Sequence, residues 1–197
     1  GHEEDAADRV VAAAPDGHDA HEHGEYDPHV WLDPMNAKQE MQNICEAFSE
    51  ADPEHRADYQ ANYEKWAKQL DELDKTYQTT LENLSERNIV VAHEAYGYLC
   101  RRYNLTQVSI EGMSPDSEPD PGRMADIIDF VRANNVRAIF FEELSGSRTA
   151  ETVAAETGVK LLPLSPLEGL SDRQEETGGD YFSVMEENLQ QLTEALR

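Results

Sequence analysis

Residues 53–84 read PEHRADYQANYEKWAKQLDELDKTYQTTLENL, and they set the frame for the rest of the chain. Their apolar side chains recur mostly at alternating steps of four and three, which aligns them in one stripe along an α-helix. The stripe consists of Tyr59, Tyr63, Trp66, Leu70, Leu73, Tyr77, Leu81 and Leu84. Asp52 and Pro53 suit the cap and the first turn of this helix. About thirty residues at ~1.5 Å each predict a rod of roughly 45 Å, longer than most globular helices.

The charge of the chain narrows the class of its ligand. Among 197 residues, 16 are Lys or Arg and 41 are Asp or Glu, which gives a net charge of −25. Nucleic acid is excluded as a partner because nothing would neutralise its phosphates. A cation is a plausible ligand because a negative field concentrates cations. The charge could equally serve only solubility or life in a salt-rich habitat.

Residues 1–25 are acidic and rich in Ala, and they predict a flexible loop or tail. In this stretch His18, His21 and His23 lie among acidic residues, a composition that can bind divalent metal weakly; an accidental polar tail is the alternative. No apolar run reaches the roughly 20 residues of a membrane span. The sequence begins with Gly1 and shows no signal sequence, so we expect a portion of a longer protein.

A second amphipathic helix is expected before the long one. Asp33 can cap it and Pro34 suits its first turn, and it should continue to about Ser49. Its apolar positions, expected to be buried, are Met41, Ile44, Cys45 and Phe48. Cys100 lies in a similar apolar set, so we expect both cysteines to be small buried side chains without a disulfide between them.

After the long helix, short apolar runs alternate with helical patterns. Strands are predicted at residues 89–92, 107–110, 138–141 and 159–164. Helices are predicted at residues 95–103, around 124–131, and at 148–157 and 181–196. Strands and helices that alternate with short connections predict an α/β fold, a four-stranded parallel sheet with helices on both faces.

The residues that follow these strands carry the candidate chemistry. His93, Glu111, Glu142 and Glu168 each come just after a predicted strand. Ligands bind beyond the carboxyl ends of the strands in an open parallel sheet, so these side chains should share one rim. Imidazole and carboxylate are ligands for Zn²⁺ and similar ions, and we therefore predict a divalent-metal site there.

We expect different environments for two further histidines. His29 precedes a helix start, where a side chain can be presented to a ligand, although a core histidine is the alternative. His55 lies among charged residues and is expected at the solvated surface. No nucleophile elbow, phosphate-binding loop or dinucleotide fingerprint is present. A zinc hydrolase would need an open coordination position and a general base such as Glu94 or Glu142, which the spacing does not demand.

Three motifs resemble one family of proteins. They are Asp27-Pro28-His29-Val30-Trp31-Leu32-Asp33-Pro34, Val91-Ala92-His93-Glu94-Ala95-Tyr96-Gly97-Tyr98 and Leu164-Ser165-Pro166-Leu167-Glu168-Gly169-Leu170. The run Asp180-Tyr181-Phe182-Ser183-Val184-Met185 and the loop from Ser114 to Pro121 are also similar. From Tyr26 onward the chain resembles the zinc-binding solute-binding proteins of bacterial ABC importers, in which a long helix joins two lobes.

This resemblance implies a function and a ligand set. His29, His93 and Glu168 would bind the metal, and Glu142 would orient His93 or hold water. Manganese-carrying relatives tend to have a carboxylate at the place of His93, so zinc is expected rather than manganese. The protein would be an extracytoplasmic receptor, not an enzyme, that delivers Zn²⁺ to an ABC permease. The alternatives are a zinc-dependent hydrolase and a manganese-binding or adhesin-type member of the family.

The resemblance also implies a division of the chain. Residues 1–25 would be the flexible loop, 26–52 the end of the first lobe, 53–86 the linking helix and 87–197 the second lobe. Most of the first lobe, which contributes a further histidine ligand in the family, has no counterpart here. A fourth ligand would then come from water or a neighbouring chain, and a second copy of the chain could cover the apolar surface left bare.

Overall fold

We describe residues 26–112 and 119–197 of a computed structural model. The 3₁₀ turns are η1 (Val30–Leu32) and η2 (Pro53–His55). The helices are α1 (Pro34–Ala51), α2 (Arg56–Leu81), α3 (Gly97–Tyr103), α4 (Pro121–Ala133), α5 (Arg148–Thr157), α6 (Asp172–Glu176) and α7 (Tyr181–Leu196). The strands are β1 (Asn88–Val91), β2 (Thr106–Ser109), β3 (Ala138–Phe141) and β4 (Lys160–Pro163). The expected histidine loop of residues 1–25 and most of the loop after Ser114 lie outside the described residues.

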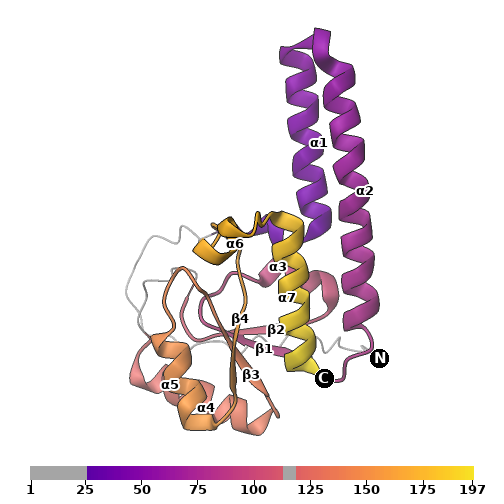
Figure 1. Cartoon of the computed structure of the whole chain (residues 1–197). Helices are drawn as coiled ribbons and strands as arrows, with labels where there is room; N and C mark the ends of the chain where they lie inside the picture. The colour runs from indigo at the N-terminus through magenta and orange to yellow at the C-terminus, as the bar shows by residue number, and fades with distance from the viewer. Residues whose placement is uncertain (1–25, 113–118) are drawn as a thin grey trace, which may run out of the picture.

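The four strands form one parallel sheet in the order β2-β1-β3-β4. Successive side chains of a strand face opposite sides, so each strand supplies two cores. Val91 and Phe140 face the core made with α2, α3 and α7, whereas Val90 and Ile139 face the core made with α4 and α5. Helices therefore cover both faces of the sheet, as Figure 1 shows, and the predicted α/β fold is confirmed.

The strand order places a crevice in a definite position. From β1 the chain moves to β2 on one side, and it then crosses over to β3 on the other side of β1. The direction of winding reverses between β1 and β3, and ligands of open α/β sheets bind at such a switch point beyond the carboxyl ends of the strands. The residues that follow β1 and β3 at this point are His93 and Glu142.

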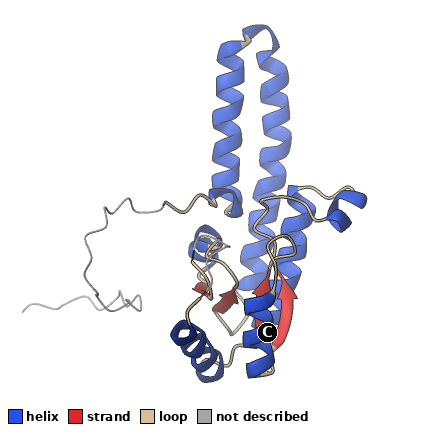
Figure 2. Ribbon diagram, turned by 90° about the vertical axis from the view of Figure 1, so that its left-hand side faces the viewer, coloured by secondary structure: helices blue, strands red, loops and turns tan. Residues whose placement is uncertain are grey.

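The long helix is confirmed over Arg56–Leu81, with a 3₁₀ turn in place of its expected first turn. The side chain of Asp52 makes no cap hydrogen bond to the helix backbone; its carboxylate accepts hydrogen bonds from His55 Nδ1 at 2.8 Å and from the Tyr59 hydroxyl at 3.0 Å instead. The helix pairs with α1 as a hairpin that rises from the α/β unit (Figures 1 and 2). Among the described residues, no helix is apolar and long enough to cross a membrane.

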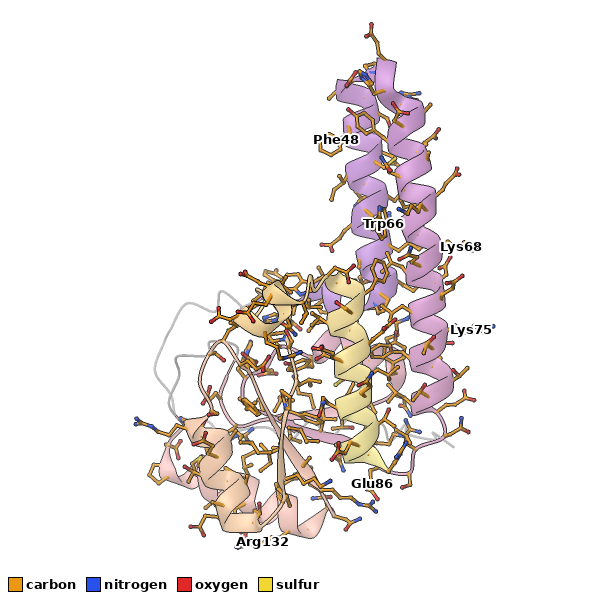
Figure 3. The ribbon with its side chains drawn as sticks, in the orientation of Figure 1. Phe48, Trp66, Lys68, Lys75, Glu86 and Arg132 are labelled. Atoms are coloured by element: carbon orange, nitrogen blue, oxygen red, sulfur yellow. The ribbon has the colours of Figure 1, made fainter. Side chains whose placement is uncertain are left out.

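The apolar stripe of α2 is buried only where the helix meets the α/β unit. The buried positions of the helix α2 are Ala67, Leu70, Leu73, Asp74, Tyr77 and Leu81. Farther out, Tyr59 and Tyr63 are only half-buried because α1 alone packs against that part of the helix. Trp66 lies at the transition (Figure 3). Its ring stacks on Phe182 of α7 at a centroid distance of 5.7 Å.

The expected burial of the apolar positions of α1 is wrong. Ile44 and Phe48 are each 54% exposed, and Met41 and Cys45 are half-buried. Their helix face meets α2 at its edge but no third layer, since the hairpin stands away from the sheet. Cys45 and Cys100 are both free thiols, as expected, but only Cys100 is buried.

Candidate metal centre

The three side chains that the motifs single out come from separate parts of the chain. His29 caps η1 and is 1% exposed, and His93 follows β1 and is also 1% exposed. Glu168 lies in the loop after β4, with 44% of its side chain exposed. Folding brings one atom of each to within 4.8 Å of the others, so the structure places the predicted residues in one cluster.

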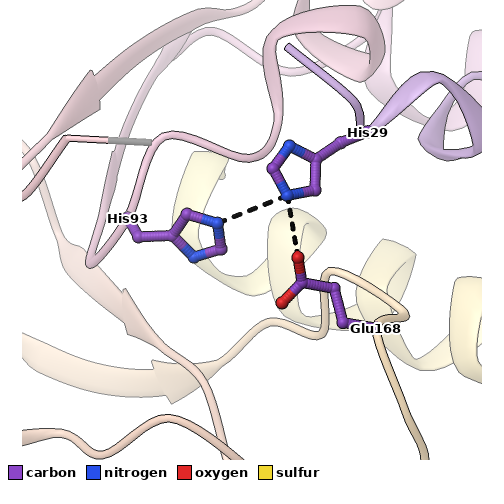
Figure 4. Close-up of side chains that lie close together, drawn as sticks. All are labelled: His29, His93 and Glu168. Carbon is purple, nitrogen blue, oxygen red and sulfur yellow. Dashed lines mark hydrogen bonds and ion pairs between the residues drawn. The ribbon is translucent and has the colours of Figure 1, made fainter. Parts of the chain in front are cut away.

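The spacing of these atoms suits a tetrahedral ion. His29 Nε2 lies 3.4 Å from His93 Nε2 and 3.0 Å from Glu168 Oε1 (Figure 4). Bonds of about 2.0–2.2 Å to a tetrahedral zinc would separate neighbouring ligand atoms by roughly 3.3–3.6 Å. The two printed separations from His29 Nε2 are thus close to those of a tetrahedral site, and all three atoms lie within 4.8 Å of one another.

A buried carboxylate fixes the orientation of His93. The Nδ1 atom of His93 is hydrogen-bonded to Glu142 Oε1, and the Ser145 hydroxyl donates to Glu142 Oε2 at 2.7 Å. An ionised carboxylate only accepts, so Nδ1 carries the hydrogen and Nε2 is left to face the cluster. Burial lowers the pKa of His93, but the hydrogen bond to Glu142 and the nearby charges of Glu142, Glu168 and Glu111 outweigh it and raise this pKa overall.

His29 has a partner of the same kind that the sequence did not single out. Asp27 Oδ1 lies 2.8 Å from His29 Nδ1 and also accepts the His29 backbone N–H at 3.0 Å. The signal was present in the first motif, because an Asp two residues before a histidine can form an Asx turn. Both histidines thus present Nε2 to the cluster and Nδ1 to a carboxylate.

The loop that carries Glu168 is held in an unusual conformation. Leu167 has φ +58°, a left-handed conformation that costs a bulky residue energy, and its N–H donates to Ser165 Oγ at 3.2 Å. Trp31 Nε1 donates to the Pro166 carbonyl at 2.8 Å, and the Tyr181 hydroxyl donates to the Trp31 carbonyl at 2.8 Å. Two hydrogen bonds thus tie the segment of His29 to the loop of Glu168 and to α7.

Replacing Trp31 with phenylalanine should weaken metal binding by up to about 10-fold. The change keeps an aromatic side chain of smaller size but removes the donor to Pro166, and one hydrogen bond contributes ~0.5–1.5 kcal/mol. Zinc titration against a chromophoric chelator would measure it. The matched control is Trp66→Phe, which alters the stack on Phe182 and the contact of Lys65 Nζ with the ring. Equal affinities for the two variants would contradict this role of Trp31.

Not every predicted rim residue joins the cluster. Glu111 is hydrogen-bonded to the Thr149 hydroxyl, and burial together with the charge of Glu142 raises its pKa. Glu142 contacts His93 from the side away from the other two ligand atoms, as a partner of the imidazole. His55 is exposed, as expected. His18, His21 and His23 lie outside the described residues.

A cavity of about 580 Å³ adjoins the cluster. Glu142 and Glu168 belong to its wall, and residues of α7 such as Glu187 and Asn188 line it farther away. Because both histidines are buried and Glu168 is not, the carboxylate side is the side from which solvent reaches the cluster.

Comparison with known proteins shows the family to which the chain is similar. The sequence profile of the family described as zinc-uptake complex component A, periplasmic, matches residues 2–195. The high-affinity zinc uptake system protein ZnuA of Bacillus subtilis is 38% identical over 170 residues, which are 86% of this chain and 53% of that protein. The zinc-binding protein AdcA of Streptococcus pyogenes is 38% identical over 191 residues, 97% of this chain and 37% of that protein.

Solved structures are similar over the same region. The Zn(II)-bound ZnuA-like domain of Streptococcus pneumoniae AdcA is 36% identical with a TM-score of 0.76, over 89% of this chain and 66% of that one. The laminin-binding protein Lmb of Streptococcus agalactiae, described as bifunctional with adhesin and metal-transporting activity, is 33% identical with a TM-score of 0.79, over 87% and 65%. This chain thus spans about a third to two thirds of its relatives, and it belongs to the family of the periplasmic zinc-uptake component A.

Proposed function

We propose that this chain binds Zn²⁺ as cargo through His29, His93 and Glu168, in an extracytoplasmic receptor that delivers the ion to an ABC permease. The spacing of His29 Nε2 from the other two ligand atoms carries the proposal, because 3.4 and 3.0 Å are close to the distances between neighbouring ligands of a tetrahedral ion. The zinc uptake named in the description of the family supports it. Receptors of this kind bind and release an ion without chemical change, so no catalytic residue is assigned.

The fixed orientation of the two imidazoles favours zinc over manganese. Imidazole suits zinc, whereas manganese prefers sites made mostly of carboxylate and water oxygens. Two of the three proposed ligands are imidazoles, and each is already turned with Nε2 toward the cluster. Glu168, with half of its side chain in solvent, is the ligand most free to move when the ion enters or leaves.

Calorimetry on this chain tests the choice of metal. We expect Zn²⁺ to bind with one ion per chain and at least about 100-fold more tightly than Mn²⁺, in line with the order of affinities of divalent ions for nitrogen ligands. Equal or tighter binding of Mn²⁺ would overturn the proposal. His55→Ala is the control, since His55 is exposed and pairs only with Asp52.

The chain is proposed to divide as its resemblance implies. Residues 26–52 and 53–86 would form the end of a first lobe and the linking helix, and 87–197 the second lobe. The half of α2 that packs on α3 and α7 supports a stiff link between lobes with modest motion. The fourth ligand would come from water or another part of the full receptor. The histidines of the 1–25 loop are proposed as auxiliary metal ligands, and a second copy as a cover for Ile44 and Phe48.

An adhesin is the second candidate function. It is favoured by one observation, the likeness to a laminin-binding protein that is described as both adhesin and metal transporter. Deleting the gene separates the two. A receptor for uptake predicts a growth defect under zinc limitation that added zinc repairs, whereas a pure adhesin predicts normal growth and reduced binding to host matrix.

A further inference from the structure

The carboxylate of Asp27 is held between two of the sequence motifs. Its Oδ1 accepts both the backbone N–H of His29, at 3.0 Å, and the ring Nδ1, at 2.8 Å. Its Oδ2 points to the first turn of α3, where a Cβ built on Gly97 would lie only 2.8 Å away. The absence of a side chain at position 97 therefore leaves the room that the carboxylate occupies.

This arrangement determines which nitrogen of His29 is available. A carboxylate cannot donate, so Nδ1 must carry a hydrogen to bond Asp27. Nε2 is then the nitrogen whose lone pair can bind a metal, once the ion replaces the present contact of Nε2 with Glu168 Oε1. Nε2 is the atom that faces His93 and Glu168. The chain restricts Asp27 further, because the residue before a proline is confined to extended conformations, and the Pro28 carbonyl accepts the Val30 N–H at 2.8 Å.

We propose that Asp27 and Gly97 form a positioning pair that presents His29 Nε2 to the metal, an inference that rests on the proposed zinc function. Asp27 supplies the negative acceptor, and Gly97 supplies the space that keeps this acceptor against the ring. The pair matches Glu142 with His93, so each imidazole is oriented by its own carboxylate. The orientation of His29 in the first motif therefore depends on Gly97 in the second motif.

Replacing Asp27 tests whether its carboxylate is needed as the hydrogen-bond acceptor of His29. Asp27→Ala is expected to raise the dissociation constant for zinc by about 10- to 100-fold, the usual effect of losing a group that orients a metal-binding histidine. Asp27→Asn keeps an oxygen acceptor and should recover most of this loss. In metal-free protein, long-range ¹⁵N–¹H NMR of the imidazoles should show a hydrogen on His29 Nδ1, and Asp27→Ala should lower the occupancy of that hydrogen.

The chain offers a matched control for this change. Asp52 accepts from His55 Nδ1 at the same 2.8 Å, but this pair is exposed and far from the cluster in sequence. Asp52→Ala should leave zinc affinity within about twofold of the original protein. A purely structural role of Asp27 as a turn former predicts lower stability with the hydrogen on His29 Nδ1 unchanged, and that result would overturn the proposal.

Gly97→Ala tests the space without removing a polar group. The added methyl should push the Asp27 carboxylate from His29 and raise the dissociation constant by about 10-fold. Gly122→Ala is the control, because Gly122 also lies in a first helical turn with its Cβ position 3.0 Å from an aspartate oxygen, that of Asp120. Equal zinc affinities of these two alanine variants would overturn the role of Gly97.

His29→Ala in the same series separates this inference from the proposed function. If His29→Ala still binds zinc as tightly as the original protein, the proposed metal site itself is wrong. If zinc binding is lost with His29→Ala but kept with Asp27→Ala and Gly97→Ala, the site is right and the positioning pair is wrong.

Discussion

Replacing His93 with alanine is expected to weaken zinc binding by at least about 100-fold. Structural zinc sites in peptides provide roughly 10–16 kcal/mol through four ligands, or about 3 kcal/mol per ligand, and 1.4 kcal/mol corresponds to a factor of ten. His93 is buried in the cluster with its Nε2 3.4 Å from His29 Nε2, so the substitution removes one of the three proposed ligands outright. Competition with a chromophoric chelator would measure the change.

The same experiment separates the roles of His93 and Glu142. Glu142→Gln alone should raise the dissociation constant for zinc by about 10- to 100-fold, because it weakens only the hydrogen bond that orients the imidazole of His93. If Glu142 acts through His93, the double variant should bind zinc no more weakly than His93→Ala alone. If the losses of zinc affinity add in the double variant, Glu142 is itself a ligand of the metal. Glu143→Gln, a neighbouring carboxylate that is exposed, is the control.

Much of the candidate site could be predicted from the sequence. His93 and Glu142 could be placed because the ends of parallel strands meet at one rim, and this reasoning needs only the strand assignments. The same reasoning could not choose between Glu111 and Glu168, since both follow strands. The choice came from the resemblance of motifs, and the structure pairs Glu111 with Thr149 instead. The role of Asp27 depends on the ring orientation of His29, which no spacing in the sequence determines.

The fold, like the site, could be predicted only in part from the sequence. Periodicity identified six of the seven helices of the described residues and the four strands; the strand ends are displaced by at most one residue and the helix ends by up to three. It missed α6, a five-residue helix that is too short to show a period. It also predicted a buried face on α1, because a pattern of apolar residues shows which side of a helix can be buried but not whether another layer lies against it. Ile44 and Phe48 are exposed for that reason.

One ionic cluster joins the helical hairpin to the α/β unit. Arg102 of α3 donates to both oxygens of Asp74 on α2, with Nε–Oδ1 2.6 Å and Nη2–Oδ2 2.8 Å. The Tyr103 hydroxyl donates to Asp74 Oδ1 at 3.0 Å, and Arg102 Nε lies 3.4 Å from Oδ1 of Asp33, the cap of α1. Arg102 therefore neutralises carboxylates from both helices of the hairpin at its base, beside the segment that carries His29.

Removing this guanidinium should lower the free energy of unfolding by about 2 kcal/mol. Breaking a fully buried ion pair costs about 3–5 kcal/mol, and the partial exposure of Arg102 reduces that figure. Arg102→Ala leaves Asp74, which is only 9% exposed, with Tyr103 and Gln78 as its remaining donors. Urea unfolding at pH 7 would measure the loss. Arg173→Ala is the matched control, because Arg173 makes a similar two-pronged contact with Glu187 at the surface and should matter much less.

The pH dependence of this loss follows from the pKa of Asp74. Burial raises that pKa, but hydrogen bonds from Arg102 and Tyr103 outweigh burial and bring it below its usual 3.8. A carboxyl whose pKa is lower in the folded state stabilises the fold above its unfolded pKa, and this stabilisation disappears as the pH falls through the folded value. Asp33 and Gln78 are the other groups that face the pair, and burial raises the pKa of Asp33, which opposes the effect in part. The difference between Arg102→Ala and the original protein should therefore be largest near pH 7 and shrink toward about pH 3. A difference that is equal at both pH values would mean that Arg102 stabilises the hairpin by packing rather than by its charge.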